Sequence, residues 1–310
     1  MRRHNLLQLA MGCFLAAAAT FTAADARSAP PPREVTPSGP GFAGVYGIQP
    51  TNSAEFLSSP DAIKSASVSG APTLIWQTLE HGEKVECLDC IAFVAPLLYD
   101  ANAKNREIAA WWLRRRILGV FGPGEVYQQT LQTLQTDADP LRRSYAAYAL
   151  GEFLFAPGIA ACSVSALSDG DAMVRAAAAS ALGRLNSDGQ GALGKAMLDS
   201  DPTVRLAALG SAGRVNTFSS MSAAAALTTD PNAAVRRRAI EVLDALDATD
   251  ALAPVAAAAQ NDSDAGVRAV ACHALGTFGN GSVLPLLQNL AANDPDTFVQ
   301  DQAEIAIKRL

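Results

Sequence analysis

Apolar residues recur along most of the chain with the spacing of one helix face. In a representative unit, the stripe consists of Val174, Ala178, Leu182 and Leu185. Intervals of three or four residues place such positions on one side of a helix with 3.6 residues per turn. Another apolar segment precedes each stripe, for example at 157–167, 192–198 and 252–259. The pattern predicts pairs of short amphipathic helices over residues 85–310.

The same string of residues returns about every 30 positions. One copy runs Asp171-Ala-Met-Val-Arg175-Ala-Ala-Ala-Ala-Ser-Ala-Leu-Gly183. The residues that lead the units are Asn102, Asp139, Asp171, Asp201, Asn232, Asp264 and Asp296. Asp and Asn are favoured N-caps, so each leading residue predicts the start of a helix. Two short helices bury their apolar faces only by stacking on neighbouring pairs, and a repeat of this length therefore predicts a solenoid.

The string Asp-(Pro)-x-Val-Arg-x-x-Ala-x-x-Ala-Leu-Gly resembles the HEAT repeat family, in particular its short bacterial lyase-type form. The resemblance implies an all-α fold, an α-α superhelix of about seven helix pairs. It also implies a hydrogen-bonded ladder of Asp and Arg through successive units. The expected ladder residues are Asp139/Arg143, Asp171/Arg175, Asp201/Arg205 and Asp264/Arg268. Units near the ends depart from the string, since Asn102 leads the first one and Gln300 replaces the Arg of the last.

The first residues have the features of a secretory signal. A short positive start is followed by an apolar run from Leu6 to Phe21 and by Ala24-Asp25-Ala26, which fits a signal-peptidase site. We expect residues 1–26 to be removed after Ala26 and the protein to be exported to a bacterial periplasm. A lipoprotein anchor at Cys13 is disfavoured, because the apolar run before it is short and Ala10 stands where a larger aliphatic residue is expected.

The region between the signal and the repeats is rich in proline. Residues 27–70 contain Ala29-Pro-Pro-Pro32 and Pro37-Ser-Gly-Pro-Gly41, compositions that are typical of extended linkers, so we expect a disordered tether. Residues 71–84 include Thr73-Leu-Ile-Trp76 and are expected to dock on the repeats as a cover segment. The repeat domain is expected to cover residues 85–310.

Composition narrows the range of functions. The chain has 310 residues, 62 of them alanine, and a net charge of −6. An acidic chain is a poor match for nucleic acid, which is bound through clustered Lys and Arg. Alanine excess with few aromatic residues favours closely stacked helices. We expect no transmembrane segment in the mature chain.

Cys87-Leu-Asp-Cys90 is the sharpest local motif. It is not a c-type haem site, because Ile91 replaces the required His. A local structural disulfide or thiol pair is favoured, a redox-active pair is the alternative, and a metal site would need more ligands than the nearby His81. Cys162 and Cys272 fall in different units, too far apart to pair, and are expected to act as small core residues.

Candidate catalytic or cofactor sites are weak. Gly189-Gln-Gly191-Ala-Leu-Gly194 matches a dinucleotide fingerprint as a string, but a repeat helix precedes it where a strand is needed, so it predicts a turn. Deoxyhypusine hydroxylases share the repeat and hold iron through His-Glu pairs, whereas His81 precedes Gly82 here and His273 precedes Ala274. The bilin-lyase relatives also share it, and nothing else in the chain indicates their chemistry. We expect no metal, no cofactor and no catalytic residues.

The exposed face of the second helices is the best candidate site. In the HEAT family these helices line the concave side, and Trp, Tyr and Arg are the residues that most often anchor interfaces. The candidates for partner contact are Trp111, Trp112, Arg115, Tyr148, Arg184, Arg214 and His273. The alternative for the tryptophan cluster is that it covers the end of the solenoid against residues 70–84.

These features favour a non-catalytic exported scaffold that binds a protein or peptide on its concave face. Two alternatives come from other classes. One is a redox accessory protein that uses Cys87 and Cys90 on a bound client. The other is a relative of the lyase-type proteins that binds a cofactor without reacting.

Overall fold

The repeating caps and stripes fold into a stack of helix pairs. The computed structural model describes residues 57–119 and 122–310, which belong to one unit running from Pro50 to Leu310. In each pair, a first helical segment leads into a second helix, which packs on it and on the second helices of neighbouring pairs. The described residues form eight such pairs. The predicted signal peptide lies outside the described residues.

The first segments of the pairs are α3 (Pro60–Val68), α5 (Ile91–Val94) with η2 (Ala95–Tyr99), α7 (Glu125–Thr136), α9 (Gly158–Ser168), α11 (Ala192–Ala196), α13 (Met221–Ala226) with η3 (Leu227–Thr229), η4 (Thr249–Ala251) with α15 (Leu252–Asn261), and η5 (Gly281–Val283) with α17 (Leu284–Asn293). The second helices are α4 (Pro72–His81), α6 (Ala103–Arg114), α8 (Pro140–Phe153), α10 (Ala172–Arg184), α12 (Pro202–Ala212), α14 (Ala233–Ala245), α16 (Ala265–Phe278) and α18 (Thr297–Ile307). A short helix η1 (Gly82–Lys84) follows α4.

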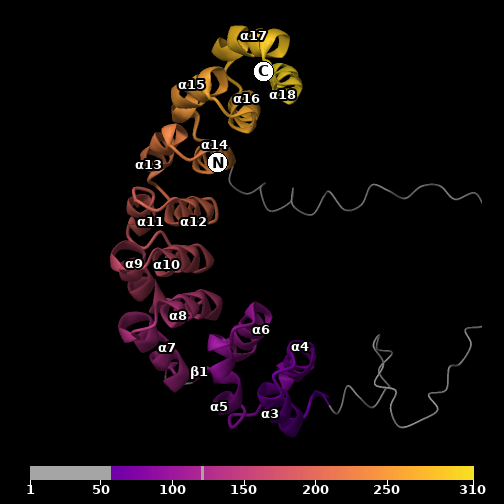
Figure 1. The fold of residues 1–310 in the computed structure, drawn as a ribbon, viewed down its shortest axis with the longest axis vertical. Helices are drawn as coiled ribbons and strands as arrows, with labels where there is room; N and C mark the ends of the chain where they lie inside the picture. Colours follow the sequence, from indigo (N-terminus) through magenta and orange to yellow (C-terminus); the bar gives the residue numbers. More distant parts are fainter. Residues whose placement is uncertain (1–56, 120–121) are drawn as a thin grey trace, which may run out of the picture. The chain divides into compact units, whose positions relative to one another are not determined.

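The two sets of helices form separate columns. From α7 to α18 the first helices line the outer side of the curved stack and the second helices line its inner, concave side (Figure 1). The predicted α-α superhelix is therefore confirmed. None of the helices in the described ranges is both long and apolar enough to cross a bilayer.

Each predicted N-cap starts a second helix. The side chain of Asp171 accepts a hydrogen bond from the backbone N–H of Met173, and Asp201 does the same for Thr203. The equivalent caps are Asn102, Asp139, Asn232, Asp264 and Asp296. Each side chain satisfies a backbone donor that the helix itself leaves free, which fixes where the helix begins.

The core lies between the columns and is made mostly of small residues. Val174, Ala178 and Leu182 of the predicted stripe are fully buried. The glycine that closes the repeated string permits close packing of second helices. A Cβ atom on Gly183 would lie 2.6 Å from Ser211 Oγ, and one on Gly276 would lie 2.7 Å from Ala306 Cα. Alanine and glycine thus set the spacing of the stack.

Residues 57–84 differ from the prediction. The expected disordered linker over 27–70 is wrong for its described end, because α3 forms there and buries Ile63 and Ala66. α3 packs on α5 and α4 packs on α6, so the two helices form an additional pair at the start of the stack. This pair lacks the Asp and Arg of the repeated string, and its α4 cap, Ala71, has no side-chain hydrogen bond. Residues 27–56 lie outside the described ranges.

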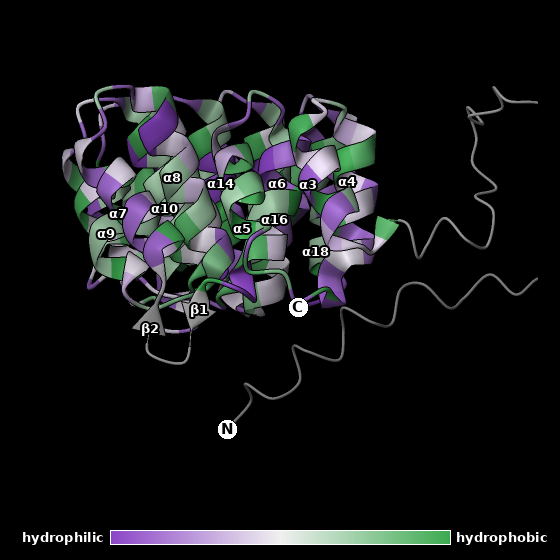
Figure 2. Cartoon of the chain, turned by 90° about the horizontal axis from the view of Figure 1, so that it is seen from below, coloured by the Kyte–Doolittle hydropathy of each residue, from purple (hydrophilic) through white to green (hydrophobic). Residues whose placement is uncertain are grey.

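The junction between the second and third pairs is irregular. Asn102 and Asp139 lie 37 positions apart, and the extra chain includes the two-residue strands β1 (Leu118–Gly119) and β2 (Gly122–Pro123). The strands pair antiparallel, with Leu118 opposite Pro123, at one edge of the stack (Figure 2). A groove of about 950 Å³ separates α5 and η2 from α7. The first-helix column is therefore interrupted here, while the second helices α6 and α8 stay in contact.

The first half of the glycine-rich string forms the predicted turn, and its second half, from Ala192 to Gly194, begins α11. Gly189, Gln190 and Gly191 have φ values of 59°, 59° and 86°. Three successive left-handed residues reverse the chain between α10 and α11, and glycine adopts this conformation without the steric cost of a Cβ.

Candidate partner-binding surface

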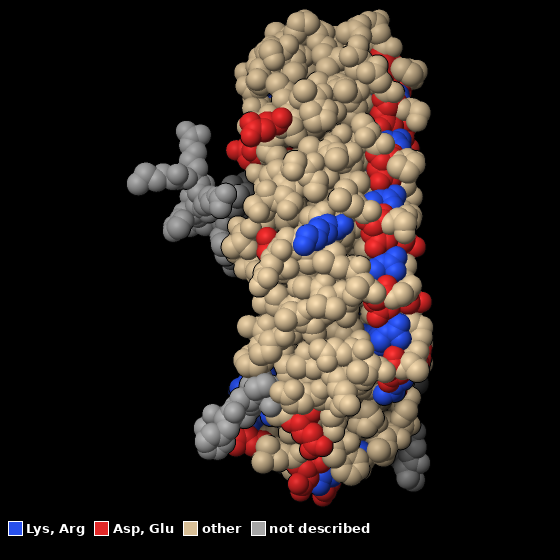
Figure 3. All heavy atoms as spheres, turned by 90° about the vertical axis from the view of Figure 1, so that its left-hand side faces the viewer, with Lys and Arg blue, Asp and Glu red and all other residues tan. Residues whose placement is uncertain are grey.

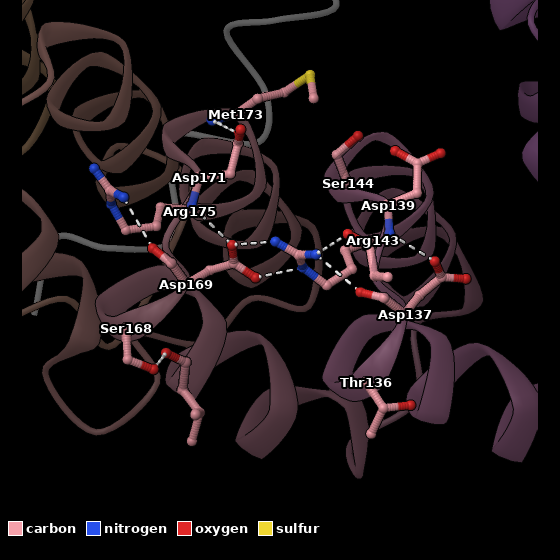
Figure 4. Close-up of polar contacts among 12 residues, drawn as sticks. Thr136, Asp137, Asp139, Arg143, Ser144, Ser168, Asp169, Asp171, Met173 and Arg175 are labelled. Atoms are coloured by element: carbon pink, nitrogen blue, oxygen red, sulfur yellow. Dashed lines mark hydrogen bonds and ion pairs between the residues drawn. The ribbon is translucent and has the colours of Figure 1, made fainter.

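A ladder of arginine and aspartate runs along one edge of the stack. Arg143 Nε and Nη2 each donate to a carboxylate oxygen of Asp169 at 2.8 Å (Figure 4). Arg175 makes the same two-pronged contact with Asp199 at 2.7 and 3.0 Å. The remaining rungs are Arg205–Asp230, Arg236–Asp262 and Arg268–Asp294. Paired N–H donors on one carboxylate make this among the stronger side-chain contacts in proteins.

The acidic partners differ from those expected. Asp139, Asp171, Asp201 and Asp264 cap helices and do not pair with the ladder arginines. Each ladder carboxylate instead lies two residues before the next cap, as Asp169 does before Asp171 (Figure 4). The signal was present in the sequence, because Asp-x-Asp or Asp-x-Asn leads every unit from Asp100 to Asp296. The ladder arginines Arg143, Arg175, Arg205 and Arg268 were assigned correctly.

Each ladder arginine also holds the loop of its own unit. Arg175 Nη1 donates to the Asp169 carbonyl at 2.9 Å, so Asp169 receives arginine contacts on both its side chain and its backbone. Gln300 Nε2 keeps this backbone contact at 2.7 Å, to the carbonyl of Asp294. Gln300 therefore reproduces the backbone contact of the ladder arginines at this position of the last described unit.

The ladder shifts the acidity of its members in the direction expected for ion pairs. Hydrogen bonds from Arg143 hold the pKa of Asp169 below its usual value, and Arg175 does the same for the pKa of Asp199. The carboxylates raise the pKa values of Arg143 and Arg175 in return. These groups remain charged near neutrality, which suits a structural ladder of ion pairs.

The two cysteines of the Cys87-Leu-Asp-Cys90 motif are bonded to each other. Cys87 and Cys90 form a disulfide just before α5. Cys90 is fully buried and Cys87 is 8% exposed. A redox partner must reach one sulfur to exchange with it, so this burial opposes a role in client oxidation. Cys162 and Cys272 are free and buried, as expected for core residues.

Most of the predicted aromatic anchors serve the fold. Trp112 was expected to contact a partner, but it is fully buried, and its Nε1 donates to the Gly82 carbonyl at 3.0 Å. Trp111 is half-buried against the core. Trp112 follows Trp111 by one residue. Successive residues of a helix point in different directions, so the Trp112 side chain is turned away from solvent and is buried. The residue at this position of the other second helices is small and buried, as in Ala181 and Ser211.

The arginines beside the tryptophans are also engaged within the chain. Arg115 pairs with Glu83 at 2.6 Å, although its side chain is 57% exposed. Arg116 lies over the Trp112 ring at 3.6 Å and donates to the carbonyls of Glu83 and Val85. Burial and the charge of Arg115 lower the pKa of Arg116 to about 10. The cluster therefore fixes η1 to α6 and covers the end of the repeats.

Tyr148 and Arg184 remain at the concave face but contact one another. The guanidinium of Arg184 lies 4.8 Å from the Tyr148 ring centre and pairs with Glu152. The three residues bridge α8 and α10. Tyr148 is half-buried, and Arg184 keeps 37% of its side chain exposed.

Further cationic side chains lie in and after the second helices of the C-terminal repeats. Arg214, in the turn that follows α12, is exposed, and its guanidinium has no hydrogen bond, ion pair or ring contact with the described residues. His273 lies 3.6 Å from Asp244 and 3.4 Å from Arg309 Nη1. Arg238 pairs with Glu241 at 3.0 Å, and both side chains are 38% exposed. The sequence candidates Arg184, Arg214 and His273 are thus accessible at least in part, whereas Trp112 is buried.

The described residues assemble neither a metal centre nor a catalytic triad. No three His, Cys, Asp or Glu side chains among them are placed to hold a metal ion. His81 Nδ1 lies 2.7 Å from the Gln77 carbonyl, and His273 faces Asp244 and Arg309. Neither histidine in this part of the chain hydrogen-bonds to a serine or cysteine.

A family model for HEAT repeats matches residues 127–213, 164–229 and 220–308. Together these segments cover more than half of the chain. The chain belongs to the HEAT repeat family. No curated protein matches it.

Solved structures agree with this HEAT fold. The X-ray structure of YibA from Escherichia coli has a TM-score of 0.56 at 17% identity and covers 86% of this chain and 99% of its own. A structure of Kap95p with RanGDP has a TM-score of 0.50 at 15% identity, covering 83% of this chain and 45% of the other. Human deoxyhypusine hydroxylase in complex with glycerol is 21% identical over 83% of this chain and 96% of its own, with a TM-score of 0.35. At their identities, the likeness to YibA and to Kap95p shows the fold alone.

Proposed function

We propose that this HEAT-repeat protein is an exported, non-catalytic scaffold that binds a protein or peptide partner on its concave face. Arg214 is the observation that carries the proposal, because it is an exposed guanidinium without a partner among the described residues. An arginine fork matches carboxylate and backbone acceptors, and arginine is a frequent interface anchor.

The charges around Arg214 support the same proposal. Arg184 and Arg238 lie on the neighbouring helices α10 and α14, and each has an acidic companion, Glu152 or Glu241. Glu152 is only 20% exposed, less than Arg184 above it. At this pair the guanidinium is more accessible to solvent than the carboxylate, which favours a partner segment with accessible acidic or carbonyl groups.

The proposed location rests on separate observations. The signal peptide remains a sequence inference. The Cys87–Cys90 disulfide supports it, because such bonds persist in oxidising compartments such as the periplasm. The redox alternative is disfavoured by the burial of Cys90.

Site-specific photo-crosslinking in the source cells tests the proposed face. A photoreactive residue at Ser180, exposed on α10, should yield a discrete adduct with another protein, whereas the same residue at Ser222, exposed on α13, should not capture that protein. Arg214→Gln with Arg309→Gln should reduce the Ser180 adduct several-fold, whereas Lys195→Gln on the outer column should leave it unchanged. An unchanged adduct in the arginine variant, or the same adduct from Ser222, would remove the assignment.

A further inference from the structure

The outer column of first helices has almost no charge. Within the bounds of α7, α9, α11, α13, α15 and α17, the charged side chains are Glu125 and Lys195 alone. The solvent face of a surface helix normally carries charged residues. Figure 3 shows this side of the molecule as almost entirely uncharged, with the ladder's alternating acids and bases confined to one edge. These outer helices therefore lack the charged residues that are expected of helices that face water.

Aliphatic side chains project from the middle of this surface. Leu198, which follows α11, is 72% exposed, and Val164 and Leu167 of the adjacent α9 are 65% and 42% exposed. A groove of about 590 Å³ runs beside them between α7 and α9, with Val164 in its wall. A contiguous exposed apolar region of this kind is characteristic of an interaction surface. We call the exposed side chains of Val164, Leu167, Leu198, Ser222 and Gln260 the neutral face.

The polar residues of this surface can pair with copies of themselves. Ser222 on α13 and Gln260 on α15 are exposed, as is Gln288 on α17. Hydroxyl and amide groups each supply both a donor and an acceptor, whereas Arg and Lys only donate and ionised Asp and Glu only accept. Asn293 already donates to Asn289 within α17 at 2.9 Å, which shows amide pairing at this surface.

We propose that the neutral face binds a second copy of this chain. A two-fold interface places the same patch on both subunits, so the patch must be complementary to itself. The protein carries a net charge of −6, and two copies that meet through charged faces repel one another. The neutral face avoids this repulsion, buries Leu198 and Val164 against apolar neighbours, and leaves the concave face free. This inference does not depend on the proposed partner.

Matched substitutions test the interface in the full-length mature protein. Leu198→Glu with Val164→Glu puts like charges into the interface and should weaken self-association at least about tenfold. Val68→Glu with Leu88→Glu is the control, because these residues are 71% and 78% exposed but lie outside the neutral face. Sedimentation velocity over a wide concentration range should show a dimer for the wild type and the control. Far-UV circular dichroism should show equal helix content in all three proteins.

Lys195 supplies a second, independent readout. It is the sole lysine within the outer-column helices named above, so a Lys195–Lys195 cross-link requires two copies facing each other through this side. An amine-reactive cross-linker on a mixture of ¹⁴N- and ¹⁵N-labelled protein should give mixed-isotope Lys195–Lys195 peptides, and the Leu198/Val164 variant should lose them. A wild-type protein that stays monomeric at all concentrations overturns the proposal. A dimer that survives the Leu198/Val164 changes, or a different protein cross-linked at Lys195, overturns it as well.

Discussion

Removing one ladder arginine should destabilise the C-terminal repeats strongly. Arg268 and Asp294 have side chains only 10% and 3% exposed. Arg268 donates to both Asp294 oxygens at 2.8 Å and to the Asp262 carbonyl at 2.9 Å. In Arg268→Met, the buried carboxylate keeps the backbone N–H of Asp296 as its donor but loses its counter-charge.

The expected cost follows from this burial. Breaking a buried ion pair by removing one partner costs about 3–5 kcal/mol, whereas an exposed pair contributes about 0.2–1 kcal/mol. The chain contains an exposed pair of the same residue types, Arg142 and Asp137, at 2.9 Å with the arginine 46% exposed. Arg142→Met is therefore the matched control and should change the free energy of unfolding by less than about 1 kcal/mol.

Urea unfolding followed by far-UV circular dichroism measures both effects, and native-state hydrogen exchange locates the loss to α16–α18. The double variant Arg268→Met with Asp294→Leu should recover much of the stability, because no unpaired charge stays buried. If Arg268→Met costs no more than Arg142→Met, the ladder does not hold the repeats together, and the reasoning from burial is refuted.

Three further predictions follow from particular residues. The pKa values of Asp169, Asp199 and Asp294 are lowered by their arginines. The stability that these ion pairs contribute is therefore complete above the unfolded-state pKa and is lost as pH falls through the lower folded-state values. Urea midpoints should be constant near neutrality and drop below about pH 4, and constant midpoints down to about pH 2 would contradict the ladder. Gly183→Ala should cost about 1–3 kcal/mol because its Cβ would meet Ser211, whereas Gly210→Ala, whose nearest neighbour is Arg238 Nη2 at 3.9 Å, should stabilise α12 by up to about 1 kcal/mol; urea titrations that show equal effects would refute the close-approach argument. Cys87→Ser with Cys90→Ser should lower the free energy of unfolding by about 2 kcal/mol, because the disulfide no longer closes its short loop, while the Ser180 photo-adduct persists. Loss of the adduct with the fold intact would favour the redox alternative.

The helix pairs were predictable because each begins with its own signal. Asp171 caps α10, Val174 and Leu182 fill the core, and Gly183 admits the next helix, so local preference and packing agree. Ser59 caps α3, but α4 carries neither the Asp or Asn cap nor the arginine of the repeated string. The identity of α3–α4 as a helix pair depends on Ile63 and Leu79 packing in the folded stack. Such contacts are not visible in local sequence.

The candidate site was predictable only in part. The face that carries Arg184 and Arg214 follows from helical periodicity. The burial of Trp112 depends on α4, which the sequence did not reveal as a helix. The ladder acids were misplaced by two residues because Asp169 and Asp171 are chemically identical, and only the fold of the loop directs one to Arg143 and the other to its own helix.

Hydrogen exchange with the protein recovered through the Ser180 adduct tests the central claim most directly. The account predicts slower exchange in α10, α12 and α14 of the bound chain, with α9, α11 and α13 unchanged by that partner. Protection centred on the outer helices, or on the segment around Cys87 and Cys90, would contradict a scaffold that works through its concave face.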